Sequence, residues 1–461
     1  MDTRLYHSLI ACISYHIFSA FSNLSFISKL LERIVFNQIT DHSIKNNLIE
    51  TFQSAYKSGH STETALLRVV NDLFCFIDEG NVSLLTMLDL SAAFDTIDHD
   101  ILFQRLSSHF GINDKVLSWI KSYLHERKQK VKLNNFYSDD LDLLYGVPQG
   151  SVLGPLLFTM YVFPIKDVIY KDIFNYHLYA DDTQLYSKFH PSDTDNVISS
   201  ISKCTLDVNN WMSSNKLKMN TDKTEIMLCG SLQKLKRIDV NSVIIGDECV
   251  YFSKSVRNLG IHLDQNLNLN THIANTRKSC YYEIRNISKF RQFISEKAAI
   301  QLVVSLVLSK LDYCNSLFYN MSSDNFNKLQ TVQNHAARVI TKSDKRSSSL
   351  PILKSLHWLP IRQRVSYKVS IMVFKCLNDS SFPSYLKDLI CIYTPNRTLR
   401  SSSDRFLLSK PFKKLSTFGQ RSFHYAAPDV WNALPYDIRS CSNFISFKRL
   451  LKTHYFRLAF E

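Results

Sequence analysis

The chain has 461 residues, of which 45% are hydrophobic and 21% are charged. This composition is typical of a globular protein and excludes a disordered chain. Only 10 glycines occur, which excludes collagen-like and glycine-rich repeats, and no apolar run approaches the ~18 residues of a membrane span. The 10 cysteines are scattered without a C-x-x-C pair. We therefore expect no structural zinc, no membrane association and a cytoplasmic or nuclear protein that is not secreted.

The net charge of +14 is distributed unevenly. Residues 1–260 carry 25 Lys and Arg against 29 Asp and Glu, a balance of −4, whereas residues 261–461 carry 30 against 12, a balance of +18. This asymmetry indicates a polyanionic partner bound mainly by the second half, with a merely solvated basic surface as the alternative. Aromatic residues that can stack on unpaired bases lie among the basic ones, including Tyr282, Trp358, Phe412 and Phe447.

In chain order, the first predicted elements are helices. Residues 1–21 form an atypical N-terminal segment without a clear signal-peptide cleavage site. From Ser25 the apolar residues recur with helical spacing, and a second helix is predicted over 62–77. The first helix has an apolar side of Ile27, Leu30, Leu31, Ile34 and Val35, opposite Lys29, Glu32 and Arg33.

The pattern then changes to strands. A continuous apolar run over 82–90 predicts a buried central strand that carries Asp89 near its end. Residues 173–189 predict a β-hairpin folded about Asp181 and Asp182. The other expected elements are a helix through Leu106, a helix around 197–213, a strand at 225–228 and mostly helices from about Leu269 onward.

Three carboxylates have the pattern of a metal site. Asp181 and Asp182 are adjacent at the predicted hairpin tip, and adjacent carboxylates repel unless a cation lies between them. Together with Asp89 they can hold two Mg²⁺ ions, which activate an attacking hydroxyl and neutralise a leaving pyrophosphate. For these residues alone, an ordinary Asp-Asp turn and an unrelated strand-ending Asp remain the alternative.

Longer motifs surround these carboxylates. They are FQSAYKSGHSTETALL (52–67), LDLSAAFDTIDH around Asp89, GVPQGSVLGPLLF (146–158), Tyr179-Ala180-Asp181-Asp182 and NNWMSSNKLKMNTDKTEIM (209–227). In this order the sequence resembles the reverse transcriptases of non-LTR (LINE-type) retrotransposons over about 22–265. Two further segments resemble the C-terminal region of these elements, SLVLSKLDYCNSLFYN (305–320) and VWNALPYDIRSCSNFISFKRLLKTH (430–454).

The resemblance implies an α+β fold. It consists of a right-hand polymerase palm, an antiparallel sheet backed by helices, with partial fingers and then a mostly helical, basic thumb and C-terminal region. The implied boundaries are fingers and palm over 22–265, thumb over 266–345 and the basic C-terminal region over 346–461. The endonuclease domain and the start of the fingers are expected to be missing from this sequence.

The resemblance also implies roles for single residues. Asp89, Asp181 and Asp182 correspond to the catalytic, metal-binding triad, assisted by the Leu90 carbonyl. Phe94 corresponds to a bulky residue that excludes the 2′-OH of ribonucleotides. The other implied site residues are Gln149 in the nucleotide pocket, Lys57 at the triphosphate, Lys223 at the leaving pyrophosphate and the supporting motif residues Tyr179, Ala180, Pro148 and Gly150. Residues 258–260 fall where the family turns toward a primer-contacting hairpin.

The implied function is an RNA-directed DNA polymerase. It would use two Mg²⁺ ions, with Mn²⁺ as a substitute, to add dNTPs to the 3′-OH of a DNA primer on an RNA template. One alternative is a catalytically inactive, retrotransposon-derived remnant that binds nucleic acid. A two-metal nuclease is a third hypothesis, but it does not explain Phe94 or Pro148-Gln149-Gly150.

Overall fold

The computed structural model describes residues 24–91, 93–133, 136–246, 248–394 and 406–461. The predicted N-terminal segment, residues 1–21, therefore lies outside the described residues. Within these ranges the chain combines an antiparallel sheet with many helices, so the predicted α+β class is confirmed.

The main sheet, within the described residues, has four strands in the order β6-β7-β1-β8, and each neighbouring pair is antiparallel. Its strands are β1 (Val82–Ser91), β6 (Asn175–Tyr179), β7 (Asp182–Phe189) and β8 (Lys218–Cys229). β1 is a central strand, as predicted. The sequence 82–90 is apolar almost throughout because β1 is covered on both faces: Leu84 and Leu88 enter one hydrophobic core and Leu85 enters the other.

The core that contains Leu84 is formed with segments between residues 39 and 245. Its helices are α2 (Phe26–Lys45), α4 (His99–Ser108), α5 (Asp114–Leu124), α6 (Gly154–Tyr161), α7 (Ile165–Val168) and α8 (Thr194–Ser214). Short elements on this side are β2 (Lys128–Gln129), β3 (Lys132–Leu133), β4 (Phe136–Tyr137), β5 (Leu141–Asp142), η1 (Pro191–Asp193), α9 (Leu232–Leu235), β9 (Ser242–Ile245) and β10 (Glu248–Tyr251). We call this the first core.

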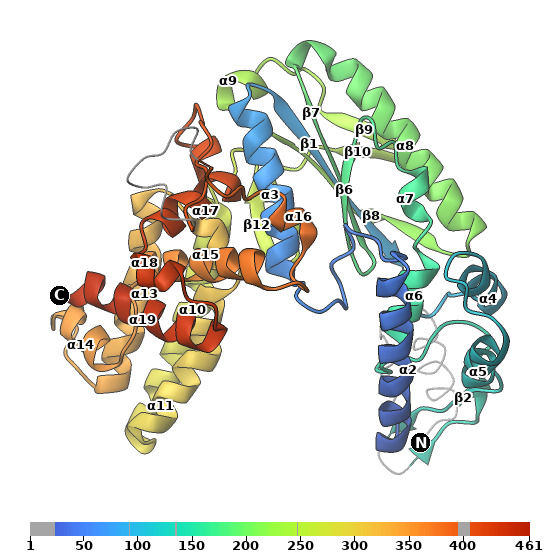
Figure 1. Cartoon of the computed structure of the whole chain (residues 1–461), viewed down its shortest axis with the longest axis horizontal. Coiled ribbons are helices and arrows are strands. Elements are labelled where there is room, and N and C mark those ends of the chain that lie inside the picture. The colour runs from blue at the N-terminus through green and yellow to red at the C-terminus, as the bar shows by residue number, and fades with distance from the viewer. Residues whose placement is uncertain (1–23, 92, 134–135, 247, 395–405) are drawn as a thin grey trace, which may run out of the picture.

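The opposite face of the sheet packs against α3 (Thr62–Asp78), and several segments of the C-terminal half pack against α3 in turn (Figure 1). This second core contains β11 (Ser255–Asn258), β12 (Ile261–Asp264), α10 (Asn270–Phe290), α11 (Glu296–Val303), α12 (Ser309–Asp312), α13 (Ser323–Thr341) and α15 (Ile361–Asn378). It also contains η3 (Val304–Leu308), η4 (Asn315–Phe318), α14 (Ser349–Ser355), α16 (Ser384–Lys387), α17 (Phe423–Asn432), α18 (Tyr436–Arg439) and α19 (Phe444–Phe460); two short turns are η2 (Arg291–Phe293) and η6 (Gly419–Arg421).

Helix α3 begins at a reciprocal cap that its sequence encodes. Ser61 Oγ accepts a hydrogen bond from the Thr64 backbone N–H at 3.2 Å, and Thr64 Oγ1 accepts one from the Ser61 N–H at 2.9 Å. This capping box fixes the start of the helix. Because α3 lies between the sheet and C-terminal segments, it is buried on more than one side.

Buried and partly buried polar bonds join α3 to the C-terminal half, and we call this set the α3 interface. Its bonds link Glu63 to Ser316, Arg68 to the Tyr385 carbonyl, Asn71 to the His424 N–H and Asp78 to the Leu415 N–H. The second core includes residues from 66 to 455, so one continuous core extends across positions 265 and 345. The boundaries of fingers, thumb and C-terminal region stay predictions.

Helix α2 leaves most of its predicted apolar side exposed and buries Glu32 from the polar side, while Lys29 and Arg33 stay exposed. Ile27 is 77% and Leu30 54% exposed, whereas Glu32 is only 1% exposed. The reason is that the Glu32 carboxylate accepts hydrogen bonds from the Val152 and Leu153 backbone N–H groups at 2.7 and 3.1 Å. A buried carboxylate that caps these donors outweighs the burial of the apolar side.

The aromatic residues of the C-terminal half divide into two groups. Tyr282 and Phe412 are 64% and 87% exposed, but Trp358 and Phe447 lie in the second core at 7% and 0%. The expectation that Trp358 and Phe447 are available to stack on bases is therefore wrong. At these two positions the aromatic ring completes the packing of α15 and its neighbours.

Candidate active site

Strand alternation brings the acidic residues to one face of the sheet. In β1, Asp89 lies four residues after Leu85, and in β7, Asp182 lies four residues before Tyr186; Leu85 and Tyr186 both enter the second core. Because side chains alternate with a period of two, both carboxylates project on the face that α3 covers. The register pairs Leu88 with Thr183, so Asp89 and Asp182 follow as neighbours across the strands.

The β6–β7 hairpin closes with a two-residue turn, Ala180–Asp181, and Asp182 opens β7. The tip thus lies one residue earlier than the predicted Asp181-Asp182. Ala180 has a φ of 56°, a left-handed conformation that is strained for a residue with a Cβ. The buried Gln53 holds it: Gln53 Oε1 accepts from the Ala180 N–H at 3.1 Å, and its Nε2 donates to the Ala180 carbonyl at 3.4 Å. Gln53 is therefore a positioning residue for Asp181.

A bulge in β8 places Lys223 at the same site. The pairing of β1 with β8 shifts between Met87, opposite Glu225, and Asp89, opposite Asn220. The residues between them project out of the ladder. From this bulge the ammonium of Lys223 lies 3.4 Å from Asp89 Oδ2. The structure thus brings Lys223 to the carboxylates, and its role at the leaving pyrophosphate stays a prediction.

A pocket of about 340 Å³ opens between these groups. Its lining consists of Met87, Leu88, Asp89, Asp182, Thr183, Asp222, Lys223, Glu225 and Arg257. It combines four carboxylates with two cations. Such a pocket suits a ligand that carries both negative phosphates and metal ions.

Burial and mutual repulsion perturb the carboxylates. The pKa of Asp182 is raised to about 6, first by burial, then by Asp181 and Asp89, with Lys223 opposing the shift. The pKa of Asp181 is also raised, mainly by burial and then by Asp89. Burial therefore contributes more to these shifts than the repulsion between the carboxylates does.

The donor set suits a hard divalent cation. Asp89 Oδ2 is buried and has no hydrogen-bond donor among the described residues, only the Lys223 ammonium at 3.4 Å. Hard carboxylate oxygens of this kind are ligands that Mg²⁺ prefers. Within the described ranges, however, no three His, Cys, Asp or Glu side chains are gathered closely enough to hold a metal ion as they stand.

The loop 146–154 lies beside Phe94, and neither Phe94 nor Gln149 is among the residues that line the pocket. The Val147 N–H donates to the Phe94 carbonyl at 2.9 Å, and Gln149 Nε2 lies 3.1 Å from each carboxylate oxygen of Asp95. The Phe94 ring is half-buried and packs on Phe158, with centroids 4.7 Å apart. Phe94 and Gln149 therefore lie close together.

Three other motif residues take supporting positions. Pro148 is buried in the same loop, and Gly150 is exposed with a φ of 88°. Tyr179 ends β6 beside the Asp181 turn. Leu90 pairs with Met219 across β1 and β8, and its side chain lies in the first core.

Lys57 is not brought to the pocket. Its ammonium donates to the Glu50 carbonyl, and burial lowers its pKa to about 8 while Glu50 opposes this shift. In its neighbour Tyr56, which is 48% exposed, burial raises the pKa of the hydroxyl and the charge of Asp181 adds to the shift.

Sequence reasoning missed three residues that shape the site: Gln53, Glu32 and Arg257. Gln53 lies within a quoted motif but makes contacts 127 residues away, and Glu32 has the pattern of a surface residue. Arg257 lines the pocket from β11. A buried Gln or Glu cannot be distinguished from an exposed one by periodicity, so only the position of Gln53 beside a motif was a usable signal.

Comparisons with known proteins point the same way. A family model described as "Reverse transcriptase (RNA-dependent DNA polymerase)" matches residues 19–263. In Drosophila melanogaster, a probable RNA-directed DNA polymerase from transposon BS is 26% identical over 371 residues, and that from mobile element jockey is 24% identical over 333. These alignments cover 76% and 69% of this chain but only 39% and 35% of the relatives.

Among solved structures, apo telomerase from Candida Tropicalis aligns at 12% identity with a TM-score of 0.37, over 73% of this chain and 54% of that one. This likeness is too slight to carry an argument. Separately, none of the described helices has the length and apolar character needed to cross a membrane.

Proposed function

Because the chain belongs to the reverse transcriptase (RNA-dependent DNA polymerase) family, we propose that it catalyses RNA-templated DNA synthesis. The reaction adds a deoxynucleotide to the 3′-OH of a DNA primer. The observation that carries this proposal is the pocket in which Asp89 and Asp182 from neighbouring strands meet Lys223, with the Asp181 turn beside it.

Asp89, Asp181 and Asp182 would hold two Mg²⁺ ions, or Mn²⁺ in their place, with the Leu90 carbonyl as a further ligand. Bound metal ions would supply activation of the primer hydroxyl and neutralisation of the pyrophosphate. Gln53 fixes the turn that carries Asp181, and the sheet register fixes Asp89 beside Asp182. These contacts keep the carboxylates together against their repulsion.

Lys223 would stabilise the leaving pyrophosphate and donate a proton to it from the bulge of β8. Phe94, supported by Phe158, would form the wall that excludes a 2′-OH, and Gln149 would line the same nucleotide pocket. A direct role for Lys57 at the triphosphate would require its ammonium to leave the Glu50 carbonyl.

Primer extension on an RNA template with Mg²⁺ tests the proposal. Asp182→Asn is expected to lower the extension rate by at least ~100-fold, because it removes one charge from the carboxylate set. Asp239→Asn, at an exposed position outside the pocket, is the matched control and should retain the parental rate. Extension by Asp182→Asn at the parental rate would refute the assignment.

A second candidate is a protein that binds nucleic acid without polymerising. The balance of +18 over residues 261–461 favours it, because that charge attracts phosphates whether or not the site is active. Salt-dependent RNA binding by a parental protein that extends no primer would support this alternative.

A further inference from the structure

The turn between β11 and β12 has an unusual backbone. Its two central residues, Leu259 and Gly260, have φ values of 42° and 84°. Two left-handed residues in a two-residue loop match the twist of the flanking strands, but the first position favours Asn, Asp or Gly. A leucine there is strained, so contacts from outside the hairpin must stabilise the turn.

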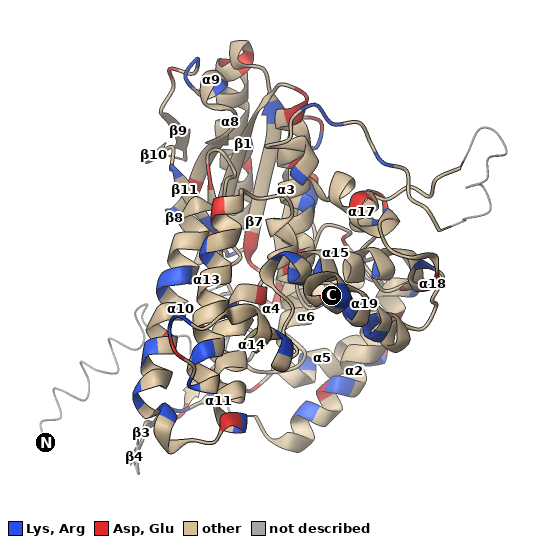
Figure 2. Ribbon diagram, turned by 90° about the vertical axis from the view of Figure 1, so that its left-hand side faces the viewer, with Lys and Arg blue, Asp and Glu red and all other residues tan. Residues whose placement is uncertain are grey.

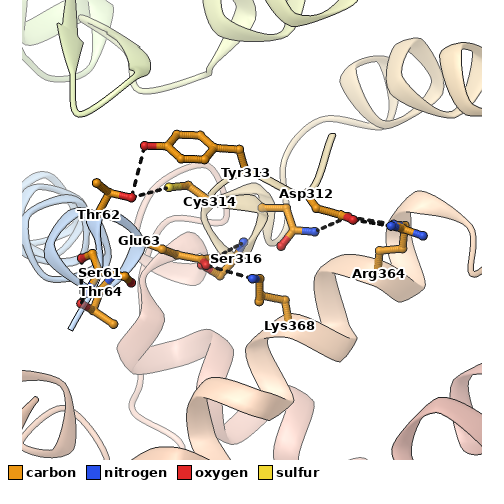
Figure 3. Close-up of polar contacts among 11 residues, drawn as sticks. Ser61, Thr62, Glu63, Thr64, Asp312, Tyr313, Cys314, Ser316, Arg364 and Lys368 are labelled. Carbon is orange, nitrogen blue, oxygen red and sulfur yellow. Dashed lines mark hydrogen bonds and ion pairs between the residues drawn. The ribbon is translucent and has the colours of Figure 1, made fainter. Parts of the chain in front are cut away.

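Tyr313, which follows α12, provides such contacts. Its hydroxyl donates to the Leu259 carbonyl at 2.6 Å and lies 3.2 Å from Thr62 Oγ1 at the start of α3 (Figure 3). The ring lies so close to Gly260 that a Cβ there would be 3.1 Å from ring atom Cε1. Tyr313 therefore holds both residues of the turn.

The segment around Tyr313 is itself anchored on both sides. Before it, Asp312 accepts from Arg364 Nε on α15 at 2.8 Å. After it, the Ser316 hydroxyl donates to the buried Glu63 carboxylate at 2.6 Å, and Lys368 lies 3.1 Å from the same carboxylate (Figure 3). These bonds fix the tyrosine relative to α3 and α15, so its hydroxyl is a stationary partner for the turn.

The turn is also connected to the acidic hairpin. Asn258, the last residue of β11, donates from Nδ2 to Gln184 Oε1 at 2.8 Å, and both side chains are buried. Gln184 lies in β7, two residues after Asp182. A short series of contacts therefore leads from Asp182 through Gln184 and Asn258 to the turn that Tyr313 holds.

We infer that Tyr313 is a positioning residue: it fixes the Leu259–Gly260 turn, and through Asn258 and Gln184 this turn supports the strand that Asp182 opens. This role rests on the proposed polymerase function. It assigns a part of the active site to a residue outside 19–263, the region that the family model matches.

The test uses the full chain and two readouts. In Tyr313→Phe, hydrogen exchange of the amides of 255–264 should be faster than in the parent. The efficiency of primer extension, kcat/KM for the primer–template, should fall roughly two- to tenfold, the effect of one lost hydrogen bond. Tyr455→Phe removes a hydroxyl 3.1 Å from Ser370 in the C-terminal region and should leave both readouts unchanged.

Gly260→Ala provides an independent disturbance of the same turn. If Tyr313 acts through the turn, the double variant should lose little more extension efficiency than Gly260→Ala alone. Parental exchange over 255–264 in Tyr313→Phe would overturn the inference, as would faster exchange with undiminished extension. A parent that extends no primer while exchange becomes faster would refute the polymerase proposal and leave Tyr313 as the residue that holds the turn.

Discussion

The two faces of the main sheet are built in different ways. The first core is formed with segments between residues 39 and 245, whereas the second core joins α3 to segments as distant as α19. The carboxylates project on the face of the second core, at its edge. The active-site motifs lie in the first half of the chain, whereas the second half completes the surface that surrounds them.

The largest effect on this arrangement is expected from Gly419→Ala. A Cβ at Gly419 would lie 2.4 Å from the Asp78 carboxylate, which the Lys414 and Leu415 N–H groups hold in place at 3.2 and 2.7 Å. We expect the free energy of unfolding to fall by about 2–4 kcal/mol, because α3 must move away from η6. Chemical denaturation measures the loss.

The matched control for this change is Gly230→Ala. A Cβ there would have its nearest neighbours at 3.5 Å, an ordinary contact, so stability should change little. Hydrogen exchange should become faster in α3 of Gly419→Ala while α8 is unchanged. Equal losses for both variants would mean that the α3 interface is no tighter than the rest of the molecule.

The second largest effect is expected from acid, which should lower the stability of the sheet face that packs against the second core. His177 in β6 is buried against Tyr385, with ring centroids 5.0 Å apart, and its pKa is lowered to about 3 by burial and then by Arg68. In the unfolded chain the His177 imidazole binds a proton near pH 6.5, whereas in the folded chain it stays neutral down to about pH 3. The contribution of His177 to the free energy of unfolding is therefore fully present above pH 6.5. It decreases as the pH falls from 6.5 toward 3, by about 2 kcal/mol at pH 5.

Denaturation at pH 7 and pH 5 checks this effect. His177→Gln cannot titrate and should lose about 2 kcal/mol less than the parent between the two pH values. His125→Gln, at an exposed position, should behave like the parent. The same acid loss in His177→Gln as in the parent would assign the pH dependence to other groups.

The smallest effect concerns the charge difference between the two halves. Lys and Arg residues are distributed along α10 and α13 (Figure 2). After α13, Lys342 and Lys345 line a groove of about 630 Å³. Replacing both with Gln should weaken RNA binding a few-fold and reduce the log–log salt slope by about 1.4, since each phosphate contact on a single strand contributes about 0.7. Filter binding across a salt series measures both.

Lys115→Gln with Lys203→Gln makes the same charge change at exposed positions in the first half. This control should bind RNA like the parent. A larger loss in the control than in the groove variant would contradict the assignment of nucleic-acid binding to the second half.

The sequence predicted what depends on local patterns. The helix over 62–77, the strand over 82–90 and the hairpin around Asp181 are confirmed, because each has a periodicity or motif within a short window. The burial of Glu32 in α2 was not predicted, because it depends on two N–H groups about 120 residues away. Tyr313 and Gly419 were missed for the same reason, since their partners lie far along the chain.

The bulge in β8 separates the position of Lys223 from the pairing of the strand. On both sides of the bulge, β8 is fixed by its own ladder with β1, so its flanks keep their register whatever lies between them. The position of the Lys223 ammonium therefore depends on the length of the bulge, and the strand pairing around it does not. We expect a change of one residue in its length to move the ammonium relative to Asp89 while the strand pairing on both sides is kept.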